Sequence, residues 1–353
     1  MKKKNHHYIP QFHLRWWSLD GKRISLFNKN IKLFIDGKAS IKNMASKDYL
    51  YGKDGIVENY LGGIEARISP IYNKIVSAKS LSVLSEEDFT YLYLHIVLCN
   101  ERTLFSADRF ETLTKTILKE ILEMQQAHGK FLEINKELIE KNVRVDNPCN
   151  LAIKTALELF PSIMDLKTIL IRNNSESLFF TSDYPSIKYN LWANKRGLYS
   201  GWGLSSAGLI FIFPISPRFA ILLYDQDIYK IDGIVNNVLT IKKRAWVDEI
   251  NKLMLLNSSE NIFIPAGVPE KYVLRLFDCV SIFENKVDGI GVWGDNDNKL
   301  ISYSGKRIFY ELKISRIKIH QKAWEVLVPK HAEGLLRPQS KKIVGQIETL
   351  LKK

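Results

Sequence analysis

The chain has 353 residues, of which 46% are hydrophobic and 25% charged, a composition that indicates a globular protein rather than a disordered or fibrous one. Its formal net charge of +13 favours anionic partners such as nucleic acid, nucleotides or acidic lipid headgroups, although a lysine-rich composition alone gives the same surplus. The three cysteines lie far apart and form no CxxC pair, which fits a reducing cytosol and argues against disulfides or a thiolate zinc site.

The first predicted element is the segment 6–17, HHYIPQFHLRWW, which combines histidines, aromatic residues and an arginine. No apolar stretch follows the lysines before it, so we expect no signal peptide and a cytoplasmic location. Pro10 predicts an extended arm that turns into a short helix, on which Gln11 and Arg15 share a face suited to lining a cavity. The imidazoles would transfer protons and Arg15 would hold phosphate. The alternative is a hydrophobic plug whose histidines satisfy backbone groups.

Helices are predicted for much of the first half. Apolar residues at helical spacing predict a helix over 55–79 and place Glu58 and Glu65 on one side of it. This pair of carboxylates either binds a metal or acts as a base, or it belongs to a solvated face. A longer helical region follows over 85–126, and Arg102 lies close to its first apolar stripe, either reaching into a site or snorkelling at the edge of the core.

Strands are predicted mainly in the second half, where β-branched and aromatic residues are frequent. The predicted strands lie at 22–35 (a hairpin), 166–172, 178–182, 209–213, 219–224, 272–277, 301–303 and 306–320. Further helices are predicted at 150–160, 235–256 and 339–351, the last one basic and amphipathic. The apolar region 207–224 is broken by two prolines and an arginine, so we expect two buried strands there and no transmembrane segment.

The stretch Thr181-Ser182-Asp183-Tyr184-Pro185 falls at the end of a predicted strand, where a scaffold presents reactive groups to a cleft. Asp183 is therefore a candidate site residue. The alternative is a turn in which its carboxylate caps backbone donors.

The blocks HHYIPQFHLR and TSDYP resemble those of a widespread family of domains of unknown function, marked by an HHYxPQxxLR start and a later TSDxP block. Weaker matches fall at Glu58, Glu65, Arg102 and Asn251. The resemblance extends to about residue 265. Leu104 and Tyr184 stand where the family often has proline and asparagine. Since the family has no settled activity, the resemblance implies positions and not a reaction.

We expect an α+β fold, in which a helical N-terminal half packs on a mixed or antiparallel sheet from the second half. Residues 1–265 would form the core domain. Residues 266–353 would form an extension with strands and a basic terminal helix, packed on that core. The N-terminal arm should lie beside the TSDYP turn.

The first functional hypothesis is a phosphodiesterase or nuclease, because cleavage of a phosphodiester needs a base, an acid and cations that hold the oxyanion. The catalytic candidates are His6, His7, Gln11 and Asp183; the substrate-binding candidates are Arg15, Arg102, Thr181, Ser182 and Asn251; the metal candidates, should a divalent metal take part, are Glu58, Glu65 and Asp183. The alternatives are a non-catalytic sensor of nucleic acid or nucleotide and a structural interaction module. A role in bacterial defence is an expectation by analogy with families that look at home among mobile-element and defence genes.

Overall fold

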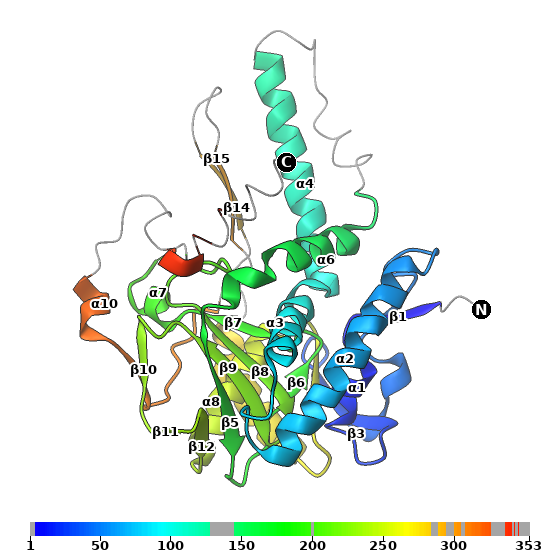
Figure 1. Ribbon diagram of the computed structural model, residues 1–353. Coiled ribbons are helices and arrows are strands. Elements are labelled where there is room, and N and C mark those ends of the chain that lie inside the picture. Colours follow the sequence, from blue (N-terminus) through cyan, green and yellow to red (C-terminus); the bar gives the residue numbers. More distant parts are fainter. Residues whose placement is uncertain are drawn as a thin grey trace.

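Figure 1 shows the computed structural model of the chain, which describes residues 4–127, 145–198, 201–283, 289–293, 300–304, 308–325, 336–340, 342 and 345. The helices are α1 (Gln11–Arg15), α2 (Ile56–Ala78), α3 (Glu86–Glu101), α4 (Leu104–Ala127), α6 (Pro148–Leu159), α7 (Leu191–Lys195), α8 (Arg244–Asn257), α9 (Glu270–Val280) and α10 (Gln321–Glu325). The strands are β1 (Asn5–His7), β2 (Arg23–Asn28), β3 (Leu33–Ser40), β4 (Ser46–Asp48), β5 (Lys167–Asn173), β6 (Thr181–Ser182), β7 (Ile187–Tyr189), β8 (Ile210–Ser216), β9 (Phe219–Tyr224), β10 (Tyr229–Ile231), β11 (Ile234–Val235), β12 (Val238–Ile241), β13 (Asn261–Ile264), β14 (Gly289–Trp293), β15 (Leu300–Ser304) and β16 (Ile317–Ile319). This distribution confirms the predicted α+β fold.

Helices α2 and α3 lie beside the main sheet, and α4 extends beyond it (Figure 1). In α2 the spacing of Leu61, Ile64 and Ile68 matches their burial, as the sequence pattern predicts. Helix α3 begins at a capping box, in which the side chains of Ser85 and Asp88 each accept a hydrogen bond from the other residue's backbone N–H. The apolar faces of α2, α3 and α6 share one hydrophobic cluster with the sheet.

The main sheet has six strands in the order β11-β12-β5-β9-β8-β7. It is mixed, because β12 pairs parallel to β5 while the other neighbours are antiparallel. Alternate residues of β8 and β9 face opposite sides, and all of them are buried. Phe211 and Leu223 pack toward the α2–α3 layer, whereas Ile212 and Leu222 belong to the cluster that contains α8. The sheet is therefore covered on both faces.

A second sheet has the order β3-β2-β13-β6 and joins segments that are distant in sequence. The predicted hairpin at 22–35 is its β2–β3 pair. Strand β13 pairs antiparallel with both β2 and β6, and β6 consists of Thr181 and Ser182. This sheet thus carries the TSDYP stretch next to the N-terminal hairpin.

The structure corrects the predicted helix over 235–256, which begins only at Arg244. Before it, Asn236 and Asn237 both have positive φ, at 50° and 58°, and form the tight turn between β11 and β12. Asparagine tolerates this backbone region better than most residues, and the Asn-Asn pair was the available sequence signal.

The structure also corrects the predicted strand over 272–277, which lies within α9. The buried residues of α9 are Val273, Leu276, Phe277 and Val280, and this is helical spacing. Of the predicted strand over 306–320, the described residues form only β16, and most of the predicted helix over 339–351 lies outside the described residues. Among the described residues, no helix combines the length and the apolar composition that crossing a membrane requires.

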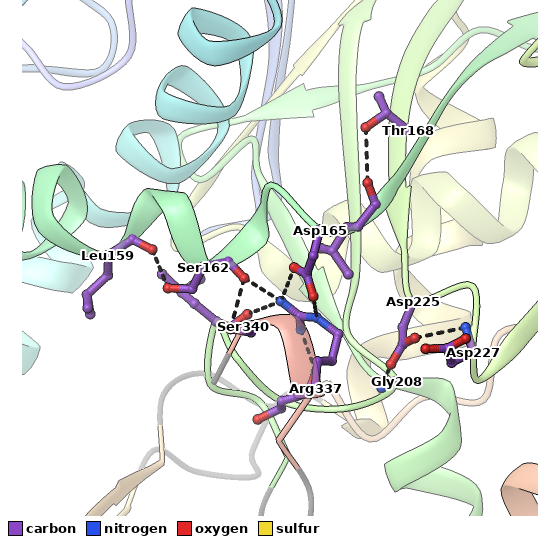
Figure 2. A network of polar contacts seen from close by, with 12 residues as sticks. Leu159, Ser162, Asp165, Thr168, Gly208, Asp225, Asp227, Arg337 and Ser340 are labelled. Atoms are coloured by element: carbon purple, nitrogen blue, oxygen red, sulfur yellow. Dashed lines mark hydrogen bonds and ion pairs between the residues drawn. The ribbon is translucent and has the colours of Figure 1, made fainter. Parts of the chain in front are cut away.

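The described parts of the region after residue 265 contact the rest of the chain closely. Tyr310 and Leu312 belong to the same cluster as α8 and the main sheet. Figure 2 shows Arg337, 4% exposed, whose guanidinium donates to both oxygens of Asp165 at 2.8 and 3.0 Å and to the Ser162 carbonyl. A charge-assisted bidentate pair of this kind ties the C-terminal segment to the turn that precedes β5.

Candidate functional site

The predicted site residues of the arm and of α2 meet at one polar pocket, which we call the arm pocket. Its volume is about 410 Å³. It is lined by His7, Gln11, Phe12 and Arg15 from the arm and by Glu58, Asn59, Gly62 and Glu65 from α2. Five of the candidate residues from two segments of the sequence therefore face a common space.

The arm side of the pocket is a chain of hydrogen-bonding groups. Arg15 donates from Nη2 to Gln11 Oε1 at 3.2 Å, and the Gln11 amide nitrogen lies 3.3 Å from His7 Nε2. His7 Nε2 also lies 3.0 Å from the carbonyl oxygen of Lys42. Because a carbonyl oxygen only accepts, this contact needs a proton on Nε2; in that tautomer Nδ1 carries the lone pair, and the Gln11 amide nitrogen, itself a donor, is a neighbour of Nε2 and not its hydrogen-bond partner.

The α2 side of the pocket is supported from behind by Arg102. This side chain is 1% exposed, and its Nη1 donates to Glu65 Oε1 at 2.9 Å. Its Nε and Nη2 are buried without a hydrogen-bond partner in the part of the chain that the structure describes. A buried guanidinium with a single ion pair depends strongly on that pair, so Arg102 and Glu65 hold each other in place. Arg102 does not itself line the pocket.

The arm also contacts the TSDYP stretch, which confirms the predicted packing of these two segments. His13 is fully buried, with Nε2 hydrogen-bonded to Thr181 Oγ1 at 2.9 Å and Nδ1 to Tyr72 Oη at 3.2 Å. Burial, with the nearby positive charge of Arg102, lowers the pKa of His13 to about 3. Burial likewise lowers the pKa of His95. Both rings are therefore neutral near pH 7 and act as interior polar contacts.

Other candidate residues make contacts away from the arm pocket. His6 is 1% exposed, accepts a hydrogen bond from the Tyr51 backbone N–H and stacks on the Tyr51 ring with centroids 5.6 Å apart. Asn251 bonds the backbone on both sides of Phe179, donating to the Leu178 carbonyl and accepting from the Phe180 N–H. These contacts hold the backbone that leads into β6. Neither residue lines the pocket.

Asp183 and Ser182 also bond to the backbone. The two Asp183 oxygens accept from the N–H groups of Ser259, Glu260 and Asn261 at 2.8, 2.8 and 2.9 Å. Ser182 Oγ accepts from the Tyr184 N–H at 3.0 Å. This geometry matches the capping alternative for Asp183, since the carboxylate fixes the loop that enters β13 and does not line the arm pocket.

The predicted metal ligands do not form a cluster. Glu58 and Glu65 line the same pocket, but Asp183 does not. Within the described ranges, no three His, Cys, Asp or Glu side chains gather as a metal centre would require.

Sequence reasoning missed Phe12, Asn59 and Gly62 among the lining residues. A helical signal for Gly62 was present, because positions 58, 62 and 65 lie on one face of an α-helix. Gly62 has nothing within 4 Å of the point where a Cβ would be, so it leaves open space at the pocket wall.

Comparison with known families gives one finding. A family model described as "Protein of unknown function (DUF4238)" matches residues 5–265, which include the arm, α2 and the TSDYP stretch. No curated protein and no solved structure matches the chain.

Proposed function

The chain belongs to the DUF4238 family of proteins of unknown function, and from its arm pocket we propose that it is a phosphodiesterase acting on nucleic acid or a nucleotide. The observation that carries the proposal is the convergence of an imidazole, a guanidinium, an amide and two carboxylates around one pocket. These groups include the proton carriers and the anion-binding cation that phosphodiester hydrolysis needs.

In this proposal His7 is the general base. Its Nδ1 lone pair takes the proton of the attacking water, while Nε2 keeps its own proton and donates it in a hydrogen bond to the Lys42 carbonyl oxygen, which fixes the ring. Arg15 holds the phosphate oxygens, and Gln11 orients Arg15 through their 3.2 Å hydrogen bond. Glu58 orients the water or, with Glu65, joins a divalent metal that the substrate phosphate brings.

The charge balance of the site is compatible with an anionic substrate. Arg15 and Arg102 carry two positive charges, and Glu58 and Glu65 carry two negative ones. Because Glu65 is already paired with Arg102, its negative charge is largely compensated before a phosphate binds near Arg15. A cytoplasmic location and a role in defence remain part of the proposal and depend on its substrate.

The test is a hydrolysis assay on labelled single-stranded RNA and DNA, duplex DNA and dinucleotides, with EDTA, Mg²⁺ or Mn²⁺. We expect His7→Ala and Arg15→Ala each to lower turnover by about 100-fold or more. The matched controls are His320→Ala and Arg67→Ala, which change the same residue types outside the pocket. A folded protein that cleaves none of these substrates, or a His7→Ala variant with full turnover, would overturn the proposal.

A further inference from the structure

A second polar pocket, the basic pocket, has a volume of about 610 Å³ and lies at the far end of α2 from the arm pocket. Its cationic lining residues are Lys79, Arg172, Lys242, Lys243 and Arg316. They come from the end of α2, from β5, from the β12–α8 connection and from the segment before β16. No acidic residue is among the described residues that line it.

These cations have no direct ion-pair partner in the part of the chain that the structure describes. None of the five forms an ion pair with a carboxylate in the described ranges, although neighbouring lysines do. Lys230 and Lys318 both pair with Asp232, whose pKa is lowered mainly by its hydrogen bond to Lys318 and, to a smaller extent, by Arg316. This carboxylate, adjacent in sequence to the lining residue Gly233, is thus already engaged. Clustered positive charges of this kind repel one another unless an anion binds between them.

The position of Arg316 is fixed by its surroundings. Its guanidinium carbon lies 5.0 Å from the centre of the Trp246 ring. Gly233, with φ +84°, also lies close to this guanidinium, because a Cβ there would come within 2.7 Å of Arg316 Nη1. The space for this guanidinium therefore exists because residue 233 is glycine.

Two further features of the pocket can donate hydrogen bonds to a ligand: the Arg172 side chain and the start of helix α8. Arg172 donates from Nη2 to Thr240 Oγ1 at 3.1 Å, but its Nε is buried with no partner among the described residues. Helix α8, 14 residues long, starts at this wall with Lys243 as its N-cap, without a side-chain cap and without an acidic residue in its first turn. The positive end of its dipole adds to the attraction for an anion.

The pocket offers charge but no free aromatic surface. Trp246 is the one aromatic side chain among its described lining residues, it is 7% exposed, and both Arg316 and Lys243 lie over its ring. A base therefore has no ring to stack on, whereas phosphate groups have five cations to contact. This combination favours a ligand that is recognised through its phosphates.

We propose that the basic pocket binds the phosphodiester backbone of a nucleic-acid strand without regard to its sequence. This inference rests on the proposed function for the choice of a strand as ligand. The two pockets share α2, with Glu58 and Glu65 near its start and Lys79 just after its end. At 1.5 Å per residue their separation along the helix axis is roughly 20–30 Å, about six to nine nucleotides at helical spacing. A long substrate reaches both pockets, and a dinucleotide reaches only one.

The test is fluorescence anisotropy with a 5′-labelled 20-nucleotide single-stranded DNA, titrated with the full chain at several salt concentrations. We expect Lys242→Gln and Arg316→Gln each to weaken binding about fivefold and to lower the slope of log K against log salt by about 0.7. Gly233→Ala should weaken binding less than Arg316→Gln does, because the new methyl group shifts the guanidinium but leaves its charge in place. The control Lys230→Gln removes a neighbouring charge and leaves the pair of Lys318 with Asp232 intact, so it should leave binding unchanged.

Two results would overturn the inference: unchanged affinity and salt slope in both Lys242→Gln and Arg316→Gln, or tighter binding of free adenosine triphosphate than of the 20-mer. Oligo-dA and oligo-dT should bind within about threefold of each other, since backbone contacts carry no sequence information. The same variants separate this inference from the proposed function. If no form of the protein hydrolyses a dinucleotide but strand binding still depends on Lys242 and Arg316, the hydrolase proposal fails and the binding site stands.

Discussion

Asp183 gives the sharpest test of which predicted residues are structural. Its carboxylate is 4% exposed and accepts three backbone N–H groups within 2.9 Å. In Asp183→Ala these donors lose their acceptor, and water reaches them only in part. A hydrogen bond to a charged group contributes about 1.5–3 kcal/mol, and the lower end applies to partly buried donors. Three such bonds give an expected loss of about 3–5 kcal/mol.

The assay is urea unfolding at pH 7, followed by circular dichroism and by tryptophan fluorescence, with a thermal scan beside it. At about 2.1 cal/mol/K of unfolding entropy per residue, the expected loss corresponds to a fall of about 4–7 °C in Tm. Asp20→Ala is the matched control. Asp20 also accepts two backbone N–H groups, from Lys22 and Arg23, but in an exposed turn, so the control should be milder.

The opposite result would show that the hydrogen bonds of Asp183 do not account for its role. If Asp183→Ala unfolds within about 1 kcal/mol of the parent chain and yet loses hydrolysis or ligand binding, the carboxylate has the catalytic or metal-binding role suggested by the sequence. If stability falls as expected and the folded variant keeps its activity at low temperature, Asp183 is a structural cap.

Three further predictions concern buried charge and buried imidazole. Arg337→Met leaves the Asp165 carboxylate buried and unpaired, so urea unfolding should show a loss of about 3–5 kcal/mol. Adding Asp165→Leu should recover only the part due to the unpaired charge, because Arg337 also donates to the carbonyls of Ser162, Leu204 and Ser206. Glu65→Gln removes the charge that faces Arg102, and a loss of about 1–3 kcal/mol is expected; unchanged stability would mean that Arg102 has another anionic partner. Burial lowers the pKa of His13 from 6.5 to about 3, so the unfolded chain takes up this proton at a higher pH than the folded chain does. The stability of the fold should therefore fall as the pH drops from 6.5 toward 3. His13→Gln should be less stable at pH 7 but should show a shallower loss across that window, measured by urea unfolding at each pH.

The sequence predicted correctly those helices and strands whose hydrophobic pattern extends over many residues. The α2 stripe, the Ser85 cap and the run that forms β8 and β9 are each fixed by neighbours within one element. Short apolar runs were ambiguous: 272–277 looks like a strand from its residue types, yet it continues into a helical stripe that ends at Val280.

The polar faces that line the arm pocket were predictable, whereas the residues of the basic pocket were not, for a physical reason. The arm pocket needs only two elements, and each presents its polar residues on one face. The basic pocket needs Lys79, Arg172 and Arg316 to meet, and their segments are joined through the main sheet and the β10–β16 pair. No periodicity within a segment indicates that meeting. The net charge of +13 favours anionic partners, but it does not indicate where on the molecule they would bind.

The backbone geometry of the arm explains why its histidines differ in role. In β1 consecutive side chains point to opposite faces, so His6 and His7 cannot both line one pocket; His6 stacks on Tyr51, and His7 faces α2. In α1, residues two apart lie about 200° apart around the axis, so His13 points into the core when Gln11 faces the pocket. Substituting His6 or His13 should therefore lower mainly the stability of the fold. Substituting His7 should change the pocket instead, so only a His7 variant can separate activity from stability.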